Sequence, residues 1–269
     1  MSRALRVLPL GLVVFLSILG AWIAPSAPER LEPRLAWCTP SALRPLGCGE
    51  AGVDLLSVVS HAELSGIALA LAVGLGGLAV GTPLGAFAAL ARGATERVVG
   101  RACDLIQAFP TFLLALVVLS AVRAPSRVHL GLVFALTAWA PFARLALVET
   151  RVLREAAFIE AAFALGLGRA RVLARHLLPN LLGVVAVQLG SAGAAIVVAE
   201  AAFAFVGMGP RDGVSLGGVL DQGVLAMLRA PHVLLVGAVS VFVTSASMLL
   251  AGTAVLDSRA RARPRASFG

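Results

Sequence analysis

Long apolar runs, separated by shorter polar segments, dominate the 269-residue sequence. An α-helix rises about 1.5 Å per residue, so about 20 apolar residues cross the roughly 30 Å hydrocarbon core of a bilayer. Six runs approach or exceed this length, at residues 7–24, 65–91, 105–122, 128–147, 181–206 and 233–256. The pattern predicts an all-α, polytopic membrane protein with about six transmembrane helices.

The polar segments divide the chain into three predicted parts. Residues 1–64 hold the first transmembrane helix and a Pro-rich outer loop, with a second helix expected to begin near Gly52. Residues 65–257 form the transmembrane core, which includes a cytoplasmic loop at 150–180, and the arginine-rich residues 258–269 are predicted to be disordered. The first apolar run also resembles a signal peptide, but it is long enough to span, so we interpret it as an uncleaved helix.

Composition and charge agree with a membrane location. The chain is 59% hydrophobic and 13% charged with a mean hydropathy of +0.95, whereas soluble domains carry about 25% charged residues. All 22 basic residues are arginines, they fall between the apolar runs, and no groove-reading motif accompanies them, so no nucleic-acid partner is predicted. With the N-terminus inside, fifteen of the 22 arginines are cytoplasmic and seven are outside, which places both termini in the cytoplasm.

Two features leave alternatives open. The three cysteines are interpreted as unrelated thiols, but Cys38 and Cys48 share one outer loop and can form a disulfide if that loop faces an oxidising compartment. Glycines crowd the second span between residues 74 and 85. Small residues let transmembrane helices approach closely, and they also loosen a helix, so this face is either tightly packed or a hinge.

The polar insert at residues 155–180 is the most informative segment, because its charges require water. Its Ala-rich first part favours a helix with a low-profile surface. Gly166 and Gly168 permit a sharp turn, and Pro179 suits the first turn of the following span. We predict a helix, a bend, and a second short helix over residues 169–178.

The spacing within this insert resembles the EAA loop of permease subunits in binding-protein-dependent ABC importers. The matching residues are Glu160-Ala161-Ala162, Gly166 and His176-Leu177-Leu178-Pro179. The ending resembles that of the dipeptide, oligopeptide and nickel branch, in its second-permease (C-type) form. The resemblance implies a type I importer permease fold, in which Glu160, Ala161, Ala162, Gly166 and Pro179 belong to a loop that couples to an ATPase. Phe163 departs from the basic residue usual in the branch.

Other segments resemble the same branch. Ala108-Phe109-Pro110 and Glu200-Ala201-Ala202 match its motifs at the third span and at the end of the fifth, whereas the outer-loop motif is eroded around Cys48-Gly49. The resemblance implies half of a translocation pathway in a bacterial inner membrane. It also implies four kinds of partner: a second, different permease chain, two ATPase subunits, an extracytoplasmic solute-binding protein and membrane lipid.

The resemblance implies no catalytic residues and no cofactor, and the four scattered histidines predict no metal site. Peptide, nickel, glutathione and opine-like solutes remain open. A degenerate or scaffolding subunit that does not transport is one alternative. An intramembrane hydrolase is a more remote one, because it needs convergent polar groups inside the spans.

Glu200 is the other candidate site residue. A carboxylate inside an apolar run is costly, so it should face a cavity, a partner or the interface. One hypothesis makes it a gate or pore-supporting group, and the favoured one makes it a hydrogen-bonding group at a helix end beside a neighbouring loop. A glutamine at this position separates the two, because lost transport with normal assembly supports the gate.

Overall fold

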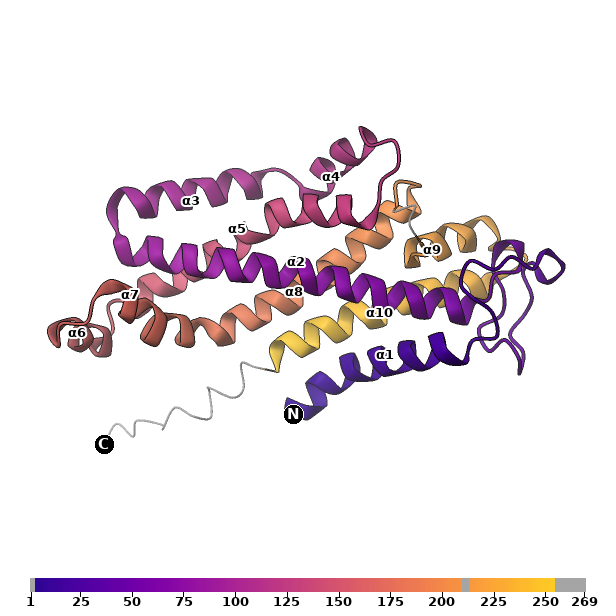
Figure 1. Ribbon diagram of the computed structural model, residues 1–269, viewed down its shortest axis with the longest axis horizontal. Coiled ribbons are helices and arrows are strands. Elements are labelled where there is room, and N and C mark those ends of the chain that lie inside the picture. The colour runs from indigo at the N-terminus through magenta and orange to yellow at the C-terminus, as the bar shows by residue number, and fades with distance from the viewer. Residues whose placement is uncertain (1–2, 210–212, 255–269) are drawn as a thin grey trace.

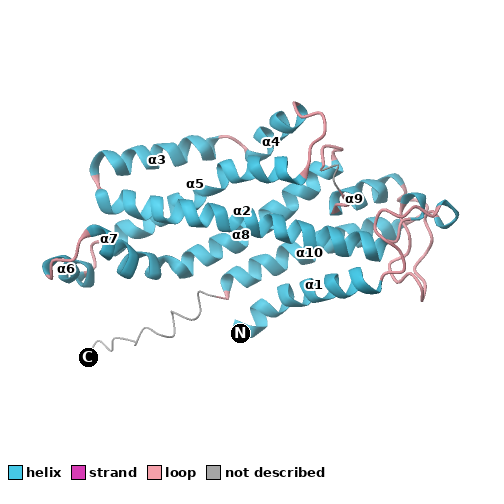
Figure 2. Cartoon of the chain, viewed as in Figure 1, coloured by secondary structure: helices cyan, strands magenta, loops and turns pink. Residues whose placement is uncertain are grey.

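The computed structural model describes residues 3–209 and 213–254, and this part of the chain is built from helices and loops (Figures 1 and 2). The predicted tail at 258–269 lies outside the described residues. The long helices are α1 (Arg3–Ile23), α2 (Leu55–Ala91), α5 (Arg127–Leu153), α8 (Leu178–Phe205) and α10 (Pro231–Thr253). The shorter ones are α3 (Gly93–Ala108), α4 (Thr111–Ser120), α6 (Ala157–Ala164), α7 (Arg169–Val172) and α9 (Leu216–Leu225). The all-α prediction is confirmed.

Five helices are long and apolar enough to cross a membrane, and α3 with α4 makes a sixth crossing if this bent pair counts as one span. The third span, predicted from the apolar run at 105–122, is formed by two helices rather than one and begins earlier. The two helices meet at 67°, with Phe109 and Pro110 in extended conformation between them. Proline lacks an N–H and disfavours helix in the residue before it, which explains the break.

The helix predicted to begin near Gly52 begins at Leu55, and it is continuous with the apolar run predicted at 65–91. The side chain of Asp54 caps this helix by accepting a hydrogen bond from the Leu56 N–H at 3.1 Å. In the sequence, His61 and Glu63 separate the start of this helix from the apolar run at 65–91. The helix therefore runs without a break through residue 64, where the sequence suggested the edge of the core.

The long helices lie side by side, and their two ends carry different structures (Figure 1). One end holds the loop after α1 together with α9, and the other holds α6, α7 and the α2–α3 junction. The ends of α1 and α10 that face away from the loop after α1 are joined, because an Arg6 Nη1–H donates to the Thr253 carbonyl at 3.2 Å. We call the α9 side the loop end and the α6–α7 side the elbow end.

Glycines bring α2 and α5 together along their backbones. A Cβ added at Gly81 would collide with the Trp139 carbonyl, and one added at Gly85 would collide with the Ala143 carbonyl. Of the two alternatives for this stretch, the structure has the tightly packed one. Gly76 lies in the same helix on the opposite side, and a Cβ there would meet no neighbour.

Candidate functional site: an elbow and a mid-membrane hollow

The polar insert folds into an elbow, by which we mean α6, the turn at 165–168 and α7. Gly166 ends α6 with a φ of +79°, a conformation that favours glycine. Its N–H donates to the Phe163 carbonyl at 2.9 Å, and the Leu167 N–H donates to the Ala162 carbonyl at 3.1 Å. These two bonds form a Schellman motif, which fixes the direction in which the chain leaves α6.

One face of α6 attaches the elbow to the transmembrane bundle. Ile159 and Ala162 are buried in a cluster with Leu90 at the end of α2 and with Val172 and Leu177 after the turn. The alanine face expected from the sequence is therefore divided, because Ala162 points inward. Buried packing of this kind ties a movement of the elbow to α2.

The opposite face of α6 is exposed. Glu160 and Ala161 lie on it, and the side chain of Glu160 makes no ion pair or hydrogen bond within the described part of the chain. Three apolar side chains stand beside them: Phe158, Phe163 and Leu165 are 44%, 40% and 82% exposed. The face is bulkier than the low-profile surface predicted from its alanines.

The second limb of the elbow is continuous with the next span. The separate short helix predicted over 169–178 is instead one turn of α7 followed by a π-helical turn, Leu173–Leu177, that runs into α8. Pro179 lies in the first turn of α8, directly after the π-helical turn. A displacement of α7 is therefore transmitted along a helix that crosses the membrane.

Arginines and glutamates connect the elbow end across three helices. Glu96 of α3 pairs with Arg151 and Arg154 at the end of α5, and the second of these lies at 3.3 Å. Glu155 pairs with Arg92 at 2.9 Å and with Arg154 at 3.2 Å. Single exposed pairs contribute little stability, but this connected set joins the α2–α3 junction to the start of the elbow. These ion pairs were not predicted from the sequence.

At the loop end, Glu200 is buried and forms an ion pair with Arg127 at the start of α5, with 3.2 Å between Arg127 Nε and Glu200 Oε1. The Arg127 guanidinium also donates to the Val214 carbonyl in the segment before α9. The pair joins α5, α8 and that segment. One partner of Glu200 is thus an arginine that also bonds the segment before α9, and both the gating role and the helix-end role stay predictions.

The outer loop is closed by a bond between Cys38 and Cys48. The structure thus has the bridged alternative rather than the favoured interpretation of three unrelated thiols. Cys103 is free and buried. Asp54 lies beside the bridged loop, and burial raises the pKa of its carboxyl against the opposing effects of the Leu56 N–H and Arg44.

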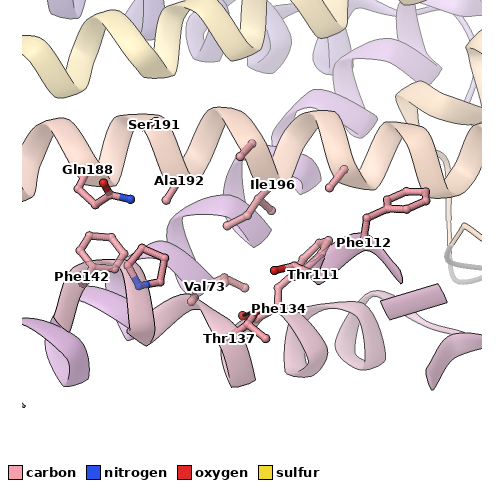
Figure 3. Close-up of a pocket in the computed structure, with 14 residues that line it drawn as sticks. Val73, Thr111, Phe112, Phe134, Thr137, Phe142, Gln188, Ser191, Ala192 and Ile196 are labelled. Atoms are coloured by element: carbon pink, nitrogen blue, oxygen red, sulfur yellow. Dashed lines mark hydrogen bonds between the residues drawn. The ribbon is translucent and has the colours of Figure 1, made fainter. Parts of the chain in front are cut away.

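A hollow of about 300 Å³ lies between α2, α4, α5 and α8 (Figure 3). Phe112, Phe134 and Phe142 supply much of its wall, and its polar groups are Thr111, Thr137, Gln188 and Ser191. None of these polar residues was predicted from the sequence, because single amides and hydroxyls are inconspicuous within apolar runs. Nor was Glu63, a carboxylate that accepts hydrogen bonds from Ser17 at 2.5 Å and Thr244 at 3.4 Å.

These features define a class of protein: a multi-pass, all-α membrane subunit with a rigidly attached elbow at one end and, between its spans, a mainly apolar hollow that contains a few polar side chains. The family model described as "Binding-protein-dependent transport system inner membrane component" matches residues 81–261. The chain belongs to this family, and it is an ABC importer permease subunit of the inner membrane, in the peptide and nickel branch. The family, the fold class and the transport role predicted from the sequence are confirmed. Such permeases work with an ATPase and a substrate-binding protein.

Curated relatives are similar over most of their length. The glutathione transport system permease protein GsiD of Shigella dysenteriae serotype 1 is 31% identical over 96% of this chain and 84% of its own. GsiD of Escherichia coli O157:H7 has the same identity and coverage. GsiD of Pectobacterium atrosepticum is 30% identical over 81% of this chain and 73% of its own.

Proposed function

We propose that the elbow of this permease docks on a separate ATPase subunit and passes its motion to the transmembrane helices. The observation that carries this proposal is the two-sided construction of α6. Ile159 and Ala162 fix it to the end of α2, while Glu160 and Ala161 face outward. An elbow attached loosely would move without moving the spans, whereas this one moves α2 and α8 together.

The exposed face of α6 suggests how the ATPase is recognised. Glu160 has no partner in the described part of the chain, so a basic residue of the ATPase would pair with it. Phe158 and Leu165 provide apolar surface for a groove on the partner. Gly166 holds the bend, and Pro179 begins the helix that carries the motion across the membrane.

The orientation we propose has both termini and the elbow in the cytoplasm. The excess of arginines on the elbow side supports it. The Cys38–Cys48 bond supports it as well, because disulfides persist in oxidising compartments and the bond lies at the loop end. The Arg6–Thr253 hydrogen bond places the described ends of the chain together.

The assembly we propose contains a second, different permease chain, two ATPase subunits and an extracytoplasmic solute-binding protein, with lipid around the apolar outer faces. ATP hydrolysis belongs to the ATPase subunits, so this chain has no catalytic residue and no cofactor. Its solute is a peptide or a related small solute, among which the names of the relatives favour glutathione. Glu200 supports the loop end of the pathway through Arg127.

Labelling of single cysteines tests the orientation. We expect Glu29→Cys, in the outer loop, to react with an impermeant thiol reagent in right-side-out membrane vesicles, and Ala161→Cys to react only in inverted vesicles. Both positions are exposed, and the native cysteines are bridged or buried, so the unmodified chain is the control. Reaction of Ala161→Cys in right-side-out vesicles would contradict the proposal, because the elbow would then lie opposite the ATPase.

A further inference from the structure

The hollow between α2, α4, α5 and α8 lies halfway along the long helices, which corresponds to the centre of a bilayer that these helices span. Val73, which lines it, is the middle residue of α2. Gln188 and Ser191 lie near the middle of α8, and Thr137 lies in the central part of α5. The hollow is partly open, so the described chain forms a wall rather than a closed chamber.

Two polar side chains at this depth have no partner within the described residues. The amide of Gln188 and the hydroxyl of Ser191 make no hydrogen bond there, and Ser191 is exposed. Figure 3 shows Gln188 reaching from α8 into the hollow on the side of Phe142. An unsatisfied polar group facing hydrocarbon costs several kcal/mol, so lipid is a poor neighbour for this face.

The faces that suit lipid are different in kind. Helices α1 and α10 expose large apolar side chains, which are Leu8, Phe15, Trp22, Leu235 and Phe242. The contrast assigns α1 and α10 to the bilayer and the hollow to a surface in contact with water, solute or protein. The hollow is therefore on the side of the chain that faces the transport pathway.

The composition of the wall restricts the chemical classes of solute that it can bind. None of the residues lining the hollow is charged, and none is a histidine or a cysteine. Carboxylates, imidazoles and thiolates are the usual side-chain ligands of divalent metal ions, so the wall offers such an ion little. A glutamine amide donates and accepts hydrogen bonds and so complements a peptide group, and the three phenylalanines provide apolar surface beside it.

We infer that this hollow is one wall of a solute-contact site at the membrane centre, in which Gln188 and Ser191 hydrogen-bond uncharged amide groups of an organic solute. The inference rests on the proposed function, since a second permease chain must cover the open side. It assigns to this chain a role in choosing the solute, beyond its role in coupling. It also predicts that the site accepts solutes with amide groups and does not accept a bare nickel ion, because the wall lacks the usual side-chain ligands of such an ion.

The first test asks whether the pathway reaches the hollow. In the assembled complex we expect a water-soluble thiol reagent to label Ser191→Cys, and we expect it not to label Leu235→Cys on the lipid face of α10. The native Cys103 is buried and does not compete. If the complex assembles and transports while Ser191→Cys stays unlabelled, the inference is overturned and the proposed function stands.

The second test uses glutathione and Ni²⁺ as probes in liposomes that hold the complete complex. We expect uptake of glutathione and no uptake of Ni²⁺, with Gln188→Leu lowering glutathione uptake about tenfold, as loss of one hydrogen bond predicts. Val198→Ala, on the exposed surface of the same helix, should transport normally. Uptake of Ni²⁺, or normal uptake by Gln188→Leu, overturns the inference, whereas transport by a complex that lacks this chain contradicts the proposed function itself.

Discussion

Replacement of Gly166 by proline should abolish the stimulation of ATP hydrolysis by solute and binding protein while leaving the chain inserted in the membrane. Proline fixes φ near −65°, and Gly166 requires +79°. Proline also removes the N–H that donates to Phe163. Together these changes cost about 3 kcal/mol or more locally, enough to unfold a single short turn. The α6 helix would then lose its fixed direction, and the ATPase would move it without moving α8.

The matched control for this variant is Gly168→Ala. Gly168 has an ordinary φ of −71°, and a Cβ there meets no neighbour, so alanine should preserve the elbow and the stimulation. Both variants are measured in the reconstituted complex, with assembly checked by co-purification of the ATPase. Normal stimulation in Gly166→Pro would remove the elbow from the coupling mechanism.

Substitution of leucine for Gly81 should prevent assembly of a stable permease. The Cβ alone would overlap the Trp139 carbonyl of α5, and backbone cannot move aside as a flexible side chain can. The helices would have to separate along a contact that also includes Gly85. Overpacking in a well-packed interior typically costs 1–3 kcal/mol, and a collision with backbone should lie at or above the upper end of that range.

Gly76→Leu is the control for this second prediction, because it places the same side chain on the same helix where nothing lies within 4 Å. We expect Gly76→Leu to accumulate and purify normally, and Gly81→Leu to be degraded or to purify without its partners. Thermal stability in detergent measures the difference. Equal stability of the two variants would show that α2 and α5 do not pack as the structure has them.

The fold class was predictable from the sequence because a membrane-spanning helix must have a minimum length and an apolar composition, and both can be read from the order of the residues. It failed where local chemistry overrode that pattern. The third crossing begins among the charged residues of α3, where Glu96 is satisfied by Arg151 and Arg154 from a helix 55 residues away along the chain. A search for apolar runs does not detect a span whose charged residues are neutralised by residues of another helix.

The candidate site divides in a similar way. Gly166 and Pro179 were predictable because each has a backbone property that its position requires. The inward orientation of Ala162 and the pairing of Glu200 with Arg127 depend on packing between distant segments. Gln188 is the clearest case, because its proposed role depends on a space between four helices that are distant from one another in the sequence.

The most direct test of the account is ATP-driven solute uptake into liposomes that contain the binding protein, the ATPase subunits and the second permease, with and without this chain. The account predicts accumulation of glutathione inside the liposomes, dependent on ATP, only when this chain is present. Equal accumulation without it, or assembly of the full complex with no uptake of any solute that the binding protein retains, would contradict the claim that this chain forms half of the pathway.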